Sequence, residues 1–498
     1  MRPHRGDLQA APARRRVAPP VSIGNIAVRI AEPGTPNART RAARLGGVSL
    51  GALALLVAGN AYAVDGTWQG PGAEWTTGTN WSSSPIVPDG TATFSNAGPT
   101  SVTISNTTSI NTIAFDALAP AYSFTIQNGA TFTITNQTSN SSSFFPAFSV
   151  NTGATMALGN GAFAEIASLA GGGNVVVGPS DSSTTLIVAG STSTTFSGSF
   201  AGAGSLEIDN GASLTLTGAS NGGNIGTIGG DLELCNCDSG GLTISGGSLT
   251  VNSLSMGVAV FGGTLAVING GTLQIGPGGQ PDLLVAGNMI VSGAGSAVTV
   301  AGFTGIGVFG PGVLTISNGG VLNSQGGAEI DAFPFGTGTP QVTVTGPGST
   351  WNVGGGLAVG GGSTGGPGSL TISNGGVVNS TAFTTIGDQF DGTSRLTVTG
   401  AGSMLNAANS LAIGDDSCGC GFVGTLTVAD GGVVNSPGAT TIDAGSTLNL
   451  GTGGLAGAII TPAIDNGGRI VANFTDTLTL AANVSGVGTL SKAGAGTL

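Results

Sequence analysis

Short runs in which apolar residues alternate with Thr, Ser or Asn recur at a fixed spacing in the second half of the chain. Three of these runs are near copies at equal intervals: LTISNGGVLNS from Leu314, LTISNGGVVNS from Leu370 and LTVADGGVVNS from Leu426. Related runs lie between them, VTVTGPGSTWN from Val342 and LTVTGAGSMLN from Leu396. The repeating unit is therefore about 28 residues long, within the range of solenoid repeats, and units of two kinds alternate.

Each unit predicts three short strands. In the unit that begins at Leu370, the strand-like runs are 370–372, 377–379 and 384–386, and their alternating apolar residues give each run one inward face. An Asn-Gly pair, residues 374–375, tolerates the positive φ of a tight turn. Three strands and three corners per coil predict an all-β fold, a right-handed parallel β-helix whose coils stack about 4.8 Å apart. A propeller blade needs about 40 residues, and a Greek-key sandwich is not expected to repeat internally.

Composition agrees with this architecture and narrows the class of protein. Of the 498 residues, 93 are Gly and only 7% are charged, and the frequent Gly, Ser, Thr, Asn and Val disfavour long helices. The Gly residues have no three-residue period with Pro, so the chain is not a collagen. Frequent Val, Ile, Leu and Phe exclude a charged disordered chain. After residue 63 the chain carries 22 acidic and three basic residues, which argues against nucleic acid as a partner.

The segment 1–63 has the pattern of a secretory signal peptide with a long basic n-region. Nine Arg residues lie within the first 44 positions, and a short apolar run follows at 48–58. This run is too short to span a bilayer, which needs about 20 residues. It leads to Ala61-Tyr62-Ala63, a small-x-small site typical of signal peptidase cleavage. We therefore predict cleavage between Ala63 and Val64 and export of the mature chain.

The alternating repeats resemble those of autotransporter passengers, the surface proteins of type V secretion, and are similar to repeats of PEP-CTERM-sorted proteins. The segment 65–96, through which Trp68, Trp75 and Trp81 are spaced, is similar to the start of many such passengers. The closing VSGVGTLSKAGAGTL, residues 484–498, resembles the autotransporter-associated β-strand repeat. The resemblance implies a bacterial protein that is secreted or held at the cell surface or outer membrane, with an outer-membrane translocator barrel as its partner.

The chain ends inside that closing motif, without barrel strands or a sorting tail after it, so we expect a truncated sequence. The expected organisation has five parts: a signal peptide (1–63), a Trp-rich cap with the first coils (64–138), an irregular β-helix (139–260), regular β-helix repeats (261–450) and a truncated autotransporter-associated strand repeat (451–498). At about 28 residues per coil, the part after the cap predicts some 14 coils and a rod about 65–70 Å long.

The mature chain lacks the residues that most catalytic arrangements need. The single His is His4, so no Ser-His-Asp arrangement, Cys-His arrangement or His-based zinc site is available after cleavage. Asp415 and Asp416 resemble the paired acids of β-helical polygalacturonases, but the His and the basic element of that family are missing. We therefore expect no catalytic residue, no cofactor and no metal site, and a solvated corner at the two aspartates.

Four cysteines form two Cys-x-Cys pairs, Cys235 with Cys237 and Cys418 with Cys420. The pairs are separated by about six or seven coils, which is too far for a disulfide between them or a shared metal site. In an oxidising compartment we expect each pair to form a local disulfide. Metal binding by two ligands and disulfides to a partner molecule are the alternatives.

Trp68, Trp75 and Trp81 have two interpretations. We expect them to cap the end of the β-helix core, because an uncapped end exposes apolar strands to water and to other chains. In the second interpretation, their rings are platforms on which sugars stack.

These observations favour a non-enzymatic stalk or adhesin. Long faces of Thr, Ser and Asn suit weak multivalent contacts with host or matrix glycans, or with further copies of the chain. The alternative is a β-helical carbohydrate-active enzyme, a polysaccharide lyase or hydrolase, which a cleft lined by three or more acidic residues on successive coils would favour. A third hypothesis is a spacer that presents a missing domain.

Overall fold

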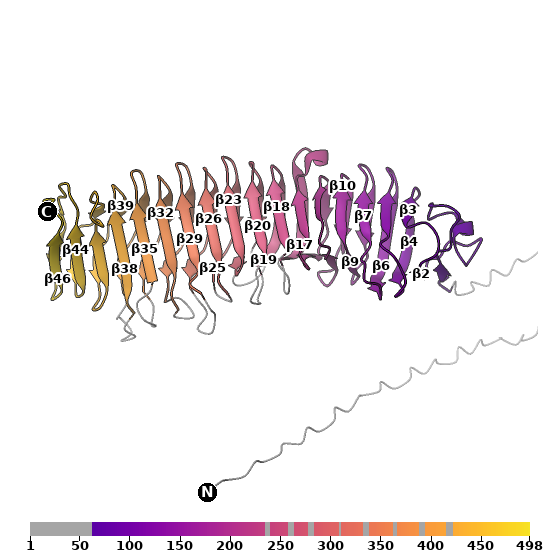
Figure 1. The fold of residues 1–498 in the computed structure, drawn as a ribbon, viewed down its shortest axis with the longest axis horizontal. Helices are drawn as coiled ribbons and strands as arrows, with labels where there is room; N and C mark the ends of the chain where they lie inside the picture. The colour runs from indigo at the N-terminus through magenta and orange to yellow at the C-terminus, as the bar shows by residue number, and fades with distance from the viewer. Residues whose placement is uncertain are drawn as a thin grey trace, which may run out of the picture. The chain divides into compact units, whose positions relative to one another are not determined.

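The computed structural model describes residues 62–234, 240–256, 263–276, 283–307, 310–331, 338–361, 366–387, 394–414 and 422–498. These residues belong to one unit, Tyr62–Leu498, which is a continuous stack of coils (Figure 1). The described residues form no α-helix; they include two short 3₁₀ turns, η1 (Gly78–Asn80) and η2 (Ala219–Asn221). None of their helices has the length and hydropathy that a bilayer-spanning helix requires.

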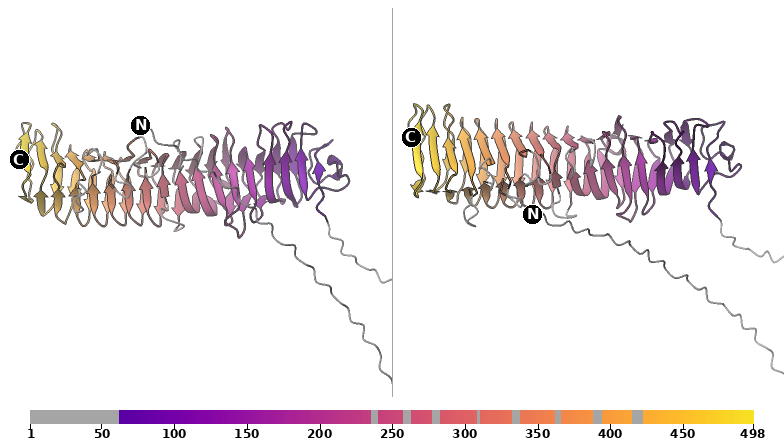
Figure 2. Two further views of the ribbon diagram at one scale, coloured as in Figure 1. Left: turned by 90° about the horizontal axis from the view of Figure 1, so that it is seen from below. Right: turned by 60° about the horizontal axis from the view of Figure 1, so that its bottom comes forward.

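Each regular coil contributes one strand to each of three parallel ladders that run along the stack, and the further views show the strands of the other faces (Figure 2). The coil for which we expected strands at 370–372, 377–379 and 384–386 contains β32 (Ser369–Ser373), β33 (Val377–Ser380) and β34 (Thr384–Ile386). These strands pair in parallel with the equivalent strands of the coils before and after. The predicted parallel β-solenoid is confirmed.

Within each ladder the strands stack in the order of the chain. The first ladder consists of β3 (Ser101–Ile104), β5 (Ser123–Ile126), β7 (Ala147–Val150), β10 (Ser168–Gly171), β13 (Ser193–Phe196), β16 (Ser213–Leu216), β18 (Gly241–Ser245), β20 (Thr264–Ile268), β23 (Asn288–Ser292), β26 (Val313–Ser317), β29 (Gln341–Thr345), β32, β35 (Ser394–Thr399), β38 (Gly424–Ala429), β41 (Thr447–Leu450), β44 (Arg469–Asn473) and β46 (Thr489–Ala493). The second consists of β8 (Thr155–Leu158), β11 (Asn174–Val177), β14 (Ser199–Ala201), β21 (Thr272–Ile275), β24 (Ala297–Val300), β27 (Val321–Ser324), β30 (Thr350–Val353), β33, β36 (Met404–Ala407), β39 (Val433–Asn435) and β42 (Ala458–Ile460).

The third ladder consists of β9 (Phe163–Ile166), β12 (Thr185–Val188), β15 (Ser205–Ile208), β22 (Leu283–Val285), β25 (Thr304–Ile306), β28 (Ala328–Ile330), β31 (Leu357–Val359), β34, β37 (Leu411–Ile413), β40 (Thr440–Ile442), β43 (Ala463–Asn466) and β45 (Asn483–Ser485). Four long strands continue from the second ladder into the third: β4 (Thr108–Phe115), β6 (Thr131–Asn140), β17 (Asn224–Leu234) and β19 (Ser248–Met256). The third ladder begins with β1 (Gly66–Thr67) and β2 (Thr91–Phe94).

The stack has about 16 turns of about 24 residues each, close to the predicted coil length. The regular repeats are longer than the average, whereas the first coils are shorter; Val102 and Phe124, for example, are partners on adjacent coils. The shorter coils give more turns than the 14 expected, and at about 4.8 Å per turn the stack is about 77 Å long. The expected subdivisions of the mature chain all lie within this one stack.

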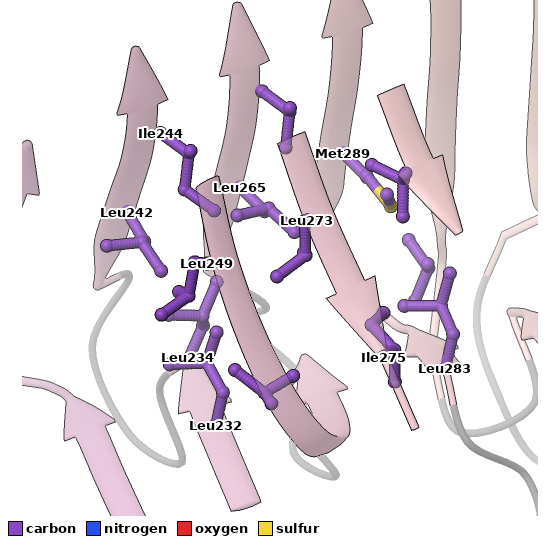
Figure 3. Packing of buried hydrophobic residues seen from close by; sticks show 14 of the residues in the cluster. Leu232, Leu234, Leu242, Ile244, Leu249, Leu265, Leu273, Ile275, Leu283 and Met289 are labelled. Carbon is purple, nitrogen blue, oxygen red and sulfur yellow. The ribbon is translucent and has the colours of Figure 1, made fainter. Parts of the chain in front are cut away.

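The core fills the space between the three ladders. On β32, Leu370 and Ile372 point inward and are fully buried, while Thr371 between them faces outward. Because the register is kept from coil to coil, most inward residues stack on equivalent apolar residues, at about 1.5–3 kcal/mol per fully buried aliphatic side chain. Ser324, Ser380 and Thr384 are buried polar exceptions. Figure 3 shows this packing for Leu232, Leu234, Leu242, Ile244, Leu249, Leu265, Leu273, Ile275, Leu283 and Met289.

Two kinds of turn explain why the sequence units alternate. In the Asn-Gly turn after β32, Asn374 has a φ of 52° and Gly375 a φ of 85°, as predicted for this pair. The next coil carries a Gly-Ala-Gly-Ser turn whose buried Ser403 accepts a hydrogen bond from Gly375 N (3.0 Å) and donates one to Thr399 O (2.7 Å). Ser349 makes the equivalent bond one pair of coils earlier. The serine of each Gly-rich turn thus accepts a hydrogen bond from the Asn-Gly turn of the coil before it. Because the two turns work as a pair, the sequence repeats every two coils.

Candidate binding surface

The structure describes only some of the residues that the sequence singled out. Cys235, Cys237, Cys418 and Cys420 lie outside the described residues, and so does the Asp415–Asp416 pair. The local disulfides and the solvated corner therefore remain predictions.

The residue after the predicted cleavage site, Val64, is held by three hydrogen bonds to Asp89 and Gly90. Val64 N donates to Asp89 Oδ1 (2.6 Å), and Val64 O accepts hydrogen bonds from Asp89 N (3.1 Å) and Gly90 N (2.9 Å). Ala63 is exposed, and Tyr62 before it is 86% exposed. Cleavage after Ala63 remains a prediction; it would leave Val64 docked on Asp89.

The three tryptophans of the N-terminal segment are buried. The rings of Trp68 and Trp75 pack edge-on against Trp81, with centroids 5.0 and 4.8 Å apart, and Trp75 also contacts Phe132 at 5.0 Å. The indole N–H of Trp81 donates to the carbonyl of Trp75 (2.7 Å). With relative exposures of 0–2%, none of the three rings has a free face on which a sugar could stack. Their position against the first coils supports the capping interpretation.

An asparagine ladder runs along the outer face of the second strand ladder. Asn323 on β27, Asn352 on β30, Asn379 on β33 and Asn406 on β36 are partners on consecutive coils. The Nδ2 of each donates to the Oδ1 of the residue before it, at 2.8, 2.7 and 2.7 Å. A side-chain amide has two N–H donors and an oxygen with two lone pairs. Each inner amide therefore keeps one donor and one acceptor for another partner.

A hollow of about 220 Å³ lies beside this ladder, at the corner that follows β30. Its lining is uncharged and consists of Asn323, Ser324, Gln325, Asn352, Val353, Gly354, Asn379 and Thr381. Gly354 occupies the corner position at which the two neighbouring coils carry Gln325 and Thr381. A Cβ atom on Gly354 would collide with the backbone of Gln325, so the path of the chain requires glycine here. We call this feature the amide hollow.

A row of carboxylates lies on the outer face of the third ladder. Glu165 on β9, Ile187 on β12, Glu207 on β15 and Glu233 on β17 are partners on consecutive coils. Glu207 and Glu233 are thus on adjacent coils, about 4.8 Å apart in backbone spacing. Burial raises the pKa of Glu207 to about 7, and the carboxylates of Glu233, Asp209 and Glu165 add to the increase.

The pKa values of the two other glutamates in the row are raised as well. Burial, with the charge of Asp209, raises the pKa of Glu165, and burial with the charges of Asp231 and Asp209 raises the pKa of Glu233. The three basic residues after the predicted cleavage site lie on β35, β44 and β46, far along the stack from this row (Figure 1). Among the described residues, no group of three or more His, Cys, Asp or Glu side chains is placed to hold a metal ion.

Sequence reasoning missed both surface features, although each leaves a trace in the sequence. Five consecutive repeat runs end in Asn or Asn-Ser, and the glutamates occupy the outward position of short apolar runs, as in SLEI at 205–208 and LEL at 232–234. Only the register between coils brings these residues together, because successive partners are 20 to 30 positions apart in the chain.

Comparison with known proteins adds one sequence relationship. No protein-family model matches the chain. Over 146 residues, 28% of this chain, it is 32% identical to the adhesin BmaC autotransporter of Brucella suis biovar 1 (strain 1330). The matched part spans 4% of the length of that protein. The match supports the resemblance to autotransporter passengers. It indicates an exported protein associated with the cell surface or outer membrane.

Among solved structures, the chain is similar to the TibC-catalyzed hyper-glycosylated TibA55-350 fragment, with a TM-score of 0.29 and 18% identity. The alignment covers 76% of this chain and 100% of the fragment. The fold assignment therefore rests on the ladders of this chain itself.

Proposed function

We propose that the chain is an autotransporter passenger that acts as a non-enzymatic stalk or adhesin, with an outer-membrane translocator barrel as its export partner. The observation that carries the proposal is the repetition of outward polar columns over many coils. On the first ladder one such column consists of Thr315, Thr343, Thr371, Thr397 and Thr427. Contacts that are weak singly become strong when many act together. Similarity to an adhesin over 146 residues supports the same function.

Multivalency gives this proposal a direct test. Beads coated with the full chain at low and high density are placed on surfaces of glycans, of extracellular matrix and of the chain itself. We expect adhesion to rise much more steeply than the coating density, while the soluble monomer binds weakly. Absence of adhesion at every density on all three surfaces would contradict the proposal and favour the spacer hypothesis.

The carboxylate row supports a second candidate function, a β-helical carbohydrate-active enzyme. Retaining glycosidases use two carboxyl groups about 5–5.5 Å apart, one of them with a raised pKa. Glu207 and Glu233 lie on adjacent coils, and the pKa of Glu207 is raised to about 7. Release of reducing ends from polysaccharides by the full chain, lost in both Glu207→Gln and Glu233→Gln, would establish this function.

The adhesin is the better supported of the two. The carboxylates face outward from a flat ladder and are only partly buried, and their raised pKa values follow from mutual repulsion and burial without any catalytic role. A lyase would in addition need a basic proton acceptor, and the basic residues of the mature chain are far along the stack.

A further inference from the structure

We infer that one coil in the first half of the stack is a pH-sensitive hinge, which stays closed in acidic medium and opens locally as the medium becomes neutral or alkaline. This coil contains β13, β14 and β15 and ends at Asp209, and we call residues 193–209 the acidic coil. The inference goes beyond the proposed adhesin function and does not depend on it. It follows from the backbone pairing of the acidic coil and from the carboxylates that gather on it.

Backbone pairing holds the acidic coil less firmly than it holds the regular coils. On the first ladder, β13 pairs with β10 of the preceding coil through a single residue pair, Gly171 with Phe196. On the second ladder, β14 pairs with β17 of the following coil through a single pair, Phe200 with Gly226. In the regular coils, β29 and β32 pair through five residues, and β30 and β33 through four. Local opening at the acidic coil therefore breaks fewer ladder contacts than opening in the regular repeats.

Carboxylates gather on the same coil, and no cation of the surrounding sequence accompanies them. Glu207 on β15 is the partner of Glu233 on the following coil. Within the described part of the chain, Oδ1 of Asp209 is buried and accepts no hydrogen bond. Residues 64–394 include no Lys, Arg or His. The titratable groups that act on Glu207 and on Glu233 are all acidic: Asp209 from the acidic coil itself, Asp231 from β17 and Glu165 from β9, while β12 between them contributes the uncharged Ile187 to the row.

Ionisation of these carboxylates disfavours the closed coil. Burial raises the pKa of Glu207 to about 7, and the charges of Glu233, Asp209 and Glu165 add to the increase. Opening exposes Glu207 to water and separates β15 from β17, so its pKa returns toward the ordinary value of 4.5. The closed coil binds the proton more tightly than the open coil, and the open coil therefore gains population as the pH rises from 4.5 through 7. Above neutral pH the thin pairing has to hold the coil against this repulsion.

The test is amide hydrogen exchange of the full chain at pH 5.5 and pH 8.5, with the intrinsic exchange rates corrected for pH. Protection of the acidic coil is measured relative to that of β32, β33 and β34, whose residues include no titratable side chain. The decisive variant combines Glu207→Gln with Glu233→Gln. A second variant, Ile187→Lys, places a cation in the gap of the carboxylate row. Asp465→Asn is the matched control, because Asp465 is an outward carboxylate of the same ladder near the other end of the stack.

In the parent we expect the relative protection of the acidic coil to fall by about fivefold or more between pH 5.5 and pH 8.5. The double variant should keep its protection at pH 8.5, Ile187→Lys should regain part of it, and Asp465→Asn should behave like the parent. Circular dichroism at both pH values shows whether each variant is folded, and Ile187→Lys decides if the double variant does not fold. The hinge is refuted when the protection of the acidic coil does not depend on pH, when β32, β33 and β34 lose protection equally, or when a folded double variant or Ile187→Lys loses as much protection as the parent.

Discussion

Replacement of Glu207 by Gln is expected to stabilise the folded chain at neutral and alkaline pH. Glu207 is partly buried on β15, next to Glu233 on the adjacent coil, and Asp209 follows it by two residues. Burial is the largest cause of its raised pKa, and the neighbouring carboxylates add to it. Gln has nearly the same shape as Glu and carries no charge. The variant therefore removes the unfavourable charge and leaves the packing of the coil intact.

The sign and size of the effect follow from proton binding. The pKa of Glu207 is about 7 in the folded chain against an ordinary value of 4.5, so the folded state binds the proton more tightly than the unfolded state. This group therefore makes the fold less stable as the pH rises from 4.5 through 7. Without solvent screening, this pKa difference corresponds to a loss of about 3 kcal/mol in the free energy of unfolding at high pH. Because Glu207 is in part exposed to solvent, we expect about 1 kcal/mol.

The assay is urea unfolding at pH 4.5 and pH 8, followed by circular dichroism. Hydrogen exchange of the amides in β15 and β17 adds a local measure, because stacked repeats open locally. The free energy of unfolding of Glu207→Gln is expected to exceed that of the parent by about 1 kcal/mol at pH 8 and to equal it at pH 4.5. Asp465→Asn is the matched control, since Asp465 occupies the same outward column between Thr441 and Ser485. A variant that is less stable than the parent at pH 8, or that differs equally at both pH values, would refute the reasoning.

Three further predictions concern the turns, the repeats and the N-terminus. Ser403→Ala leaves the partly buried N–H of Gly375 and C=O of Thr399 without their hydroxyl partner and is expected to lower the free energy of unfolding by about 1 kcal/mol; outward-facing Ser369→Ala should leave it unchanged. Deletion of residues 368–423 removes one pair of coils and rejoins equivalent positions, so the shorter chain should keep its β-sheet circular dichroism signal; loss of that signal would contradict the repeat assignment. N-terminal sequencing of the exported protein is expected to begin at Val64, and an intact Met1 would overturn the assigned cleavage site.

The regular coils could be predicted from the sequence because each contains local patterns that specify its strands and its turns. Apolar alternation specifies the inward residues, and Asn374 with Gly375 specifies the turn. The early coils also carry Asn-Gly pairs, Asn210 with Gly211 among them, but their runs are not near copies at a fixed interval, so their shorter length and the larger number of turns were not foreseen. The hydrogen bond of Ser403 to the neighbouring turn could not be predicted for another reason. Its partner Gly375 lies 28 positions away, and only a known register brings the two together.

Register also determines what a coil can contribute to binding. Along the flank of the stack the backbone groups of each ladder are occupied by the neighbouring coils, so ligands meet side chains alone. In a regular column, those side chains bind one another, as the asparagines from Asn323 to Asn406 do. Recognition therefore depends on positions where a column is interrupted. Gly354 interrupts the corner between Gln325 and Thr381, and a hollow with an apolar surface lies beside it, so this interruption is where we expect a ligand to find a contact that the regular columns do not offer.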